Sequence, residues 1–97
     1  MKIGIIGIGM LGEAVVLNLL NSGYDVAVYN RTKEKTIEVE KKGAKVMDSP
    51  KTVAENVELL IIIVKDSIAV REVAFGENGI IESKNKKIIV ADMSTID

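Results

Sequence analysis

The stretch IGIIGIGMLGEA, residues 3–14, decides the fold of this 97-residue chain. An apolar run of strand type leads into the turn Gly7-Ile8-Gly9-Met10-Leu11-Gly12, and an amphipathic segment over Met10–Asn21 follows the turn. A G-x-G-x-x-G turn between a strand and a helix is typical of dinucleotide-binding folds. Gly7 would allow the tight turn, Gly9 would let the backbone approach a pyrophosphate, and Gly12 would let the helix pack against the strand. The alternative is that the three glycines serve close packing alone.

Short apolar runs and amphipathic segments alternate along the rest of the chain. Continuous apolar runs are expected where helices cover both faces of a parallel sheet, and right-handed crossovers between such strands build a doubly wound sheet. We therefore predict an α/β fold of the Rossmann type, with about five parallel strands in the order 3-2-1-4-5. The predicted strands cover residues 3–8, 24–29, 44–47, 59–64 and 88–91, and the predicted helices cover residues 10–21, 32–42, 50–56 and 66–75.

The end of the second predicted strand carries Asn30-Arg31-Thr32. NAD-specific folds place an Asp or Glu there, which accepts hydrogen bonds from the ribose 2′-hydroxyl and would repel a 2′-phosphate. Arg31 could instead pair bidentately with that phosphate, and Asn30 and Thr32 could add hydrogen bonds. The sequence therefore predicts a preference for NADP(H) over NAD(H). The alternative is that Arg31 belongs to a solvated charged face.

Further ligand contacts are expected after the fourth predicted strand, where the order of strands reverses in such sheets. The backbone of Val64 and Lys65 would border the cofactor there, and Asp66 is expected to cap the next helix. Lys65 could donate a proton, although an exposed amine at the rim of the cleft is the simpler interpretation.

The composition excludes several other classes of function. A net charge of −1 gives no general attraction to nucleic acid or to an anionic membrane. The sequence has neither histidine nor cysteine, so the commonest metal ligands and the commonest general base are missing. The apolar run at 59–64 is far shorter than the roughly 20 residues that span a bilayer. We therefore expect a cytoplasmic protein without a metal site, since a chain without cysteine suits a reducing compartment.

Four segments of the chain together resemble a known family: IGIIGIGMLGEAVVLNLLNSGYDVAVYNRT, GAKVMDSPKTVAE, LLIIIVKDSIAVREVAFGENGI and the final DMSTI. They are similar to the amino-terminal part of the β-hydroxyacid dehydrogenases. This group includes 3-hydroxyisobutyrate dehydrogenase, the glyoxylate and succinic semialdehyde reductases and, more distantly, 6-phosphogluconate dehydrogenase. The resemblance implies that residues 1–97 form an NADP-binding domain. It further implies that the parent enzyme transfers a hydride between NADP(H) and a small 3-hydroxyacid or aldehyde acid.

The resemblance also assigns site residues. Gly7, Gly9 and Gly12 match the cofactor turn of the family, with Met10 and Leu11 between them; the family usually has methionine at the position of Leu11. Ser94 would help to hold the substrate carboxylate, and Thr95 would lie near the nicotinamide. The catalytic lysine and the helical domain that pairs subunits belong to later sequence of the family. We therefore expect a truncated domain that binds cofactor and has no catalytic residue within this chain.

Two other readings of the sequence stay open. A pyrroline-5-carboxylate-reductase-like imine reductase would also suit the glycine turn, although the final DMSTI argues against it. A non-catalytic nucleotide-sensing module would usually keep an acid where Asn30 and Arg31 stand. Because the domain is expected to be truncated, the fifth predicted strand, 88–91, would be a hydrophobic edge, so we expect self-association through it.

Overall fold

Five parallel strands form the centre of the structure, a computed structural model that describes residues 1–64, 67–85 and 87–93. The strands are β1 (Lys2–Ile6), β2 (Asp25–Tyr29), β3 (Lys45–Val46), β4 (Leu59–Ile62) and β5 (Ile89–Asp92). β1 lies in the middle and pairs with β2 and β4, while β3 and β5 are the edge strands. The order β3-β2-β1-β4-β5 confirms the predicted doubly wound sheet.

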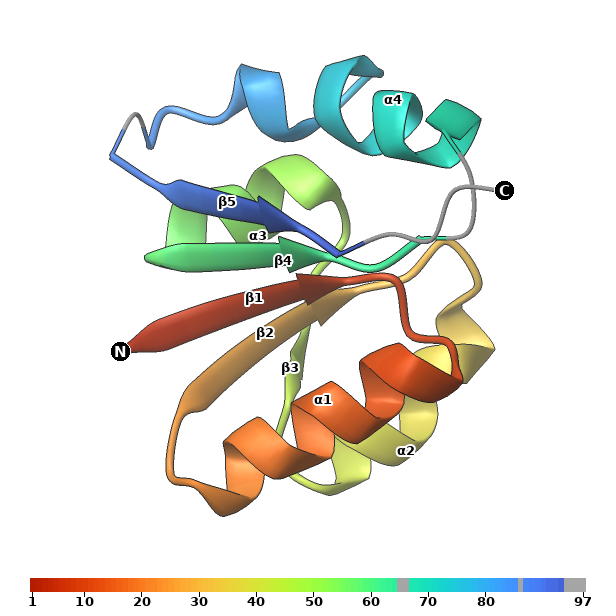
Figure 1. Cartoon of the computed structure of the whole chain (residues 1–97), viewed down its shortest axis with the longest axis vertical. Coiled ribbons are helices and arrows are strands. Elements are labelled where there is room, and N and C mark those ends of the chain that lie inside the picture. Colours follow the sequence, from red (N-terminus) through yellow and green to blue (C-terminus); the bar gives the residue numbers. More distant parts are fainter. Residues whose placement is uncertain (65–66, 86, 94–97) are drawn as a thin grey trace.

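Helices cover both faces of this sheet (Figure 1). One face carries α1 (Met10–Asn21), α2 (Ile37–Lys41) and the short 3₁₀ turn η1 (Lys33–Thr36) before α2. The other face carries α3 (Pro50–Asn56), α4 (Ser67–Phe75) and the 3₁₀ turn η2 (Ile80–Glu82). Parallel strands need this double cover because their crossover helices return over the sheet on either side.

The apolar core is divided by the sheet into two layers. Because successive side chains of a strand point to opposite faces, neighbouring β1 residues such as Ile5 and Ile6 belong to different layers. The layer under α1 and α2 contains Ile3, Ile5, Ile8, Val16, Val26, Val28, Val39 and Ala44. The layer under α3 and α4 contains Ile6, Ala27, Val53, Ala54, Val57 and Leu60. The expected run of buried strand residues is therefore found, shared between two helical layers.

Several boundaries differ from those predicted from the sequence. β1 ends at Ile6 and β4 at Ile62, two residues early in each case, and the turn at Gly7 with φ +102° explains the first difference. The predicted helix over residues 32–42 begins as the 3₁₀ turn η1, where the Thr36 hydroxyl donates to the carbonyl of Lys33 at 2.6 Å. The turn η2 was not predicted. The first position of α3 is Pro50 as predicted, and the Ser49 hydroxyl accepts from the Thr52 N–H at 3.2 Å.

β5 forms one edge of the sheet, as predicted. It pairs with β4, and its Ile89 and Val90 side chains are 66% and 45% exposed. Within the described part of the chain, no helix is both long and apolar enough to cross a membrane.

Candidate functional site

The turn after β1 can only be made by glycine at two of its positions. Gly7 has a φ of +102°, and a Cβ there would collide with the backbone carbonyl of Ile63. A Cβ on Gly12 would collide with the carbonyl oxygen of Gly7, so the first turn of α1 lies directly against the end of β1. Both glycines therefore have the geometric roles that the G-x-G-x-x-G pattern predicts.

Gly9 differs from these two glycines because the space beside it is open. No atom lies within 4 Å of a Cβ built there, although Gly9 is the N-cap of α1. The cap provides no side-chain hydrogen bond, so the first N–H groups of the helix have no acceptor from a capping side chain. The neighbouring Met10 and Leu11 side chains are exposed, Met10 by 93%. The start of α1 thus offers accessible backbone donors at the positive end of a twelve-residue helix, which suits an anion.

The side chain of Asn30 ties this turn to the end of β2. Its Oδ1 accepts a hydrogen bond from the backbone N–H of Ile8 at 2.8 Å, and its Nδ2 donates to the carbonyl of Thr32 at 2.8 Å. A backbone bond from the Gly7 N–H to the Tyr29 carbonyl, 3.0 Å, runs beside them. The sequence predicts Asn30 as a ligand contact, and the hydrogen-bonded bridge is a role that the sequence does not show. Asn30 fixes the glycine turn relative to Arg31 and Thr32.

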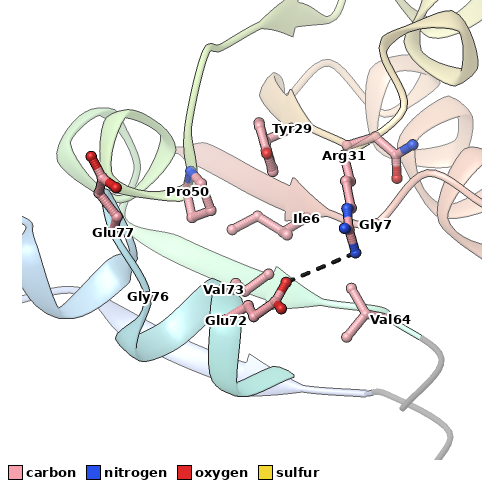
Figure 2. A pocket seen from close by; sticks show the side chains of 11 residues that line it. Ile6, Gly7, Tyr29, Arg31, Pro50, Val64, Glu72, Val73, Gly76 and Glu77 are labelled. Atoms are coloured by element: carbon pink, nitrogen blue, oxygen red, sulfur yellow. Dashed lines mark ion pairs between the residues drawn. The ribbon is translucent and has the colours of Figure 1, made fainter. Parts of the chain in front are cut away.

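A cavity of about 290 Å³ opens at the carboxyl ends of β1 and β2, next to α4 (Figure 2). Apolar side chains form much of its wall, and three charged side chains stand around it. The lining residues are Ile6, Gly7, Tyr29, Asn30, Arg31, Pro50, Val64, Glu72, Val73, Gly76 and Glu77. A largely apolar pocket with a few polar groups is the usual form of a small-molecule site. Four residues predicted for the cofactor site, Gly7, Asn30, Arg31 and Val64, line it, and Gly7 joins it to the glycine turn.

Arg31 is the cationic group of this cavity. Its side chain is 87% exposed, and one guanidinium nitrogen lies 3.9 Å from a carboxylate oxygen of Glu72 on α4. Surface ion pairs of this kind contribute only about 0–1 kcal/mol, so the guanidinium remains available to a stronger anion. Lys33 faces a different partner, with its Nζ 3.9 Å from Asp48. The exposed Thr32 lies beside Arg31 and contributes its carbonyl to the Asn30 bridge.

The remaining predicted site residues lie outside the described residues. These are Lys65, Ser94 and Thr95, together with the predicted helix cap at Asp66. Within the described residues, no group of three or more Asp, Glu, His or Cys side chains could hold a metal ion.

Comparison with known proteins gives one consistent result. Residues 2–97 match the family described as the NAD binding domain of 6-phosphogluconate dehydrogenase. The uncharacterized oxidoreductase YfjR of Bacillus subtilis is 40% identical over 99% of this chain and 34% of its own length. The glyoxylate/succinic semialdehyde reductase 1 of Arabidopsis thaliana is 36% identical over 100% of this chain and 34% of its own length.

A solved structure shows the same fold. The imine reductase from Myxococcus stipitatus in complex with NADP+ superposes with a TM-score of 0.89 at 22% identity, over 97% of this chain and 32% of that protein. The chain therefore spans about a third of the length of these proteins.

Proposed function

The chain belongs to the family of the NAD-binding domain of 6-phosphogluconate dehydrogenase, and on that premise we propose that it binds NADP(H) in preference to NAD(H). It is an NAD(P)-binding domain of the kind found in hydroxyacid dehydrogenase-like oxidoreductases.

The described residues fit a dinucleotide. The open space at Gly9 and the N–H groups at the start of α1 suit a pyrophosphate, the exposed Met10 and Leu11 continue this surface, and the buried Gly12 lets α1 lie close to the end of β1. The cavity beside Arg31 suits the adenosine end of the cofactor, with Tyr29 and Val64 in its wall. When bound, the nicotinamide supplies or accepts the hydride, and the protein contributes binding and orientation.

The preference for NADP(H) rests on one observation. The end of β2 presents Arg31 on the rim of the cavity, and Asn30, Arg31 and Thr32 leave no carboxylate directly after β2. A guanidinium can pair with two oxygens of a 2′-phosphate, whereas NAD(H) offers it only a hydroxyl. The side chain is already exposed and only loosely paired, so it can turn to a phosphate at little cost.

The parent protein is proposed to be an oxidoreductase acting on a small 3-hydroxyacid or aldehyde acid. The similarity to the Arabidopsis reductase supports this class, and Ser94 and Thr95 are the residues of this chain proposed to lie nearest the substrate. Hydride transfer to such a carbonyl requires a proton donor, and this sequence has no histidine to provide one. We therefore propose that the rest of the parent supplies the catalytic group and that the 97-residue chain binds cofactor without turnover. A cytoplasmic location fits the cysteine-free composition and forms part of the proposal.

Calorimetric titration of the 97-residue chain tests the cofactor proposal. We expect NADPH to bind at least about tenfold more tightly than NADH, because one charge-assisted hydrogen-bonded contact changes the affinity by about that much. Equal affinity for the two would overturn the proposal. Tight binding of a 2′-phosphorylated adenine nucleotide, with no gain from the nicotinamide half, would favour the nucleotide-sensing alternative.

The substrate proposal needs the parent protein. The full-length protein would be assayed for NADPH oxidation with glyoxylate, with succinic semialdehyde and with a cyclic imine. The proposal expects turnover with an aldehyde acid. Turnover with the imine alone would identify an imine reductase, a class that shares this fold.

A further inference from the structure

Glu72 places a carboxylate beside the proposed phosphate-binding group, from a part of the chain far from β2. Figure 2 shows Arg31 and Glu72 at the cavity, with the ion pair between them as a dashed line. The distance between the guanidinium nitrogen and the carboxylate oxygen is 3.9 Å, and the Glu72 side chain is 61% exposed. The next residue, Val73, packs against the core layer under α3 and α4 and also lines the cavity. This packing holds α4 so that Glu72 stays at the rim.

We propose that Glu72 is a second specificity-determining residue, one that weakens the preference for the 2′-phosphorylated cofactor. The inference rests on the proposed function, in which Arg31 binds the 2′-phosphate of NADP(H). A phosphate monoester carries about −1.5 to −2 charges at pH 7. Glu72 contacts the same guanidinium, so the phosphate meets both a competitor for Arg31 and a like charge. NAD(H) has no 2′-phosphate, so neither the competition for Arg31 nor the repulsion by Glu72 weakens its binding.

The size of the effect follows from Coulomb's law. Two anions that share one guanidinium are about 6 Å apart. In water, the repulsion between a single and a double negative charge at that distance lowers the affinity for NADPH by a factor of about ten. Salt at physiological strength screens part of this repulsion and leaves a factor of about three. The effect is therefore large enough to change the cofactor ratio and too small to reverse the attraction of Arg31.

The substitution Glu72→Gln tests the proposal because it removes the charge and keeps the shape. Glu40→Gln is the charge control: it makes the same change in net charge at an exposed position of α2, on the face of the sheet opposite α4, and Glu40 does not line the cavity. At low salt, E72Q should tighten NADPH binding by about three- to tenfold and change NADH binding by less than about twofold. E40Q should change both affinities by less than about twofold, since its charge is exposed and lies away from the cavity, where salt and water screen it.

The double variant R31A/E72Q separates an action through Arg31 from a general loss of negative charge. Because one part of the proposed effect is competition for the guanidinium, E72Q should raise NADPH affinity less in the R31A background than in the wild type. An E72Q variant with an unchanged or lowered ratio of NADPH to NADH affinity would overturn the inference. The ratio of NADPH to NADH affinity in the wild type tests the proposed function separately. A wild type that prefers NADH would refute the NADP(H) proposal. A rise in that ratio in E72Q would still support the role of Glu72.

Discussion

Replacing Asn30 by alanine should destabilise the domain through the glycine turn. The side chain makes two hydrogen bonds of 2.8 Å, one from the N–H of Ile8 and one to the carbonyl of Thr32. Ile8 is only 2% exposed, so its N–H would lose an acceptor where water has poor access. The exposed Thr32 carbonyl can turn to water at almost no cost.

The expected loss therefore comes mainly from the Ile8 N–H. A buried donor without an acceptor costs about 1–3 kcal/mol, so we expect the free energy of unfolding to fall by about 2 kcal/mol. For a domain of this size, that corresponds to a fall in Tm of about 8–16 °C. Thermal unfolding followed by circular dichroism measures it directly. The turn is common to both cofactors, so affinity for NADPH and NADH should fall together.

Asn30→Asp is the informative companion to this variant. The carboxylate still accepts from the Ile8 N–H, so this variant should keep most of the stability that Asn30→Ala loses. It also introduces an acid after β2, so the preference should move toward NADH. If Asn30→Ala unfolded within about 0.5 kcal/mol of the wild type, the bridge would not stabilise the turn and the reasoning would be refuted.

Two further predictions concern the glycine turn and the edge of the sheet. Gly12→Ala should lower the free energy of unfolding by about 3 kcal/mol because its Cβ collides with backbone, whereas Gly9→Ala should cost less than about 1 kcal/mol. In Gly9→Ala, both cofactors should nevertheless bind at least about tenfold more weakly by calorimetry; wild-type affinity would show that the open space at Gly9 is not the pyrophosphate site. At the edge, the exposed Ile89 and Val90 of β5 should support self-association at high micromolar concentration, and Ile89→Lys should abolish it. A monomeric wild type in light scattering would contradict this second prediction.

The fold was predictable because its signals are local. Every strand except the two-residue β3 contains a short apolar run, and the glycines at positions 7 and 12 mark the turn in the sequence. The boundaries were less predictable: the charged segment after Thr32 has helical composition, but its first turn is 3₁₀. Whether such a segment begins as a 3₁₀ turn or an α-helix depends on contacts such as the hydrogen bond from the Thr36 hydroxyl to the Lys33 carbonyl. The spacing of apolar residues does not predict these contacts.

The site was predictable in part. The position of Arg31 follows from counting along the chain, since the end of the second strand lies beside the glycine turn in every sheet of this order. The two additional roles depend on pairs that are distant in sequence, Asn30 with Ile8 and Glu72 with Arg31. A single sequence shows Asn30 as a candidate ligand contact after the second strand and Glu72 as one more charge on an amphipathic helix. Only the relative placement of β2, the turn and α4 gives these residues their partners.

We propose that Arg31 makes this domain prefer NADP(H). Calorimetric titration of the wild type, Arg31→Ala and Lys33→Ala with NADPH and with NADH tests it most directly. Lys33 is the matched control, an exposed cation on the same segment that pairs with Asp48. A charge-assisted hydrogen-bonded contact is worth about 1.5–3 kcal/mol, so Arg31→Ala should bind NADPH about 10- to 150-fold more weakly. Its affinity for NADH should stay within about threefold, as should both affinities of Lys33→Ala. Undiminished NADPH binding in Arg31→Ala would show that Arg31 does not bind the 2′-phosphate.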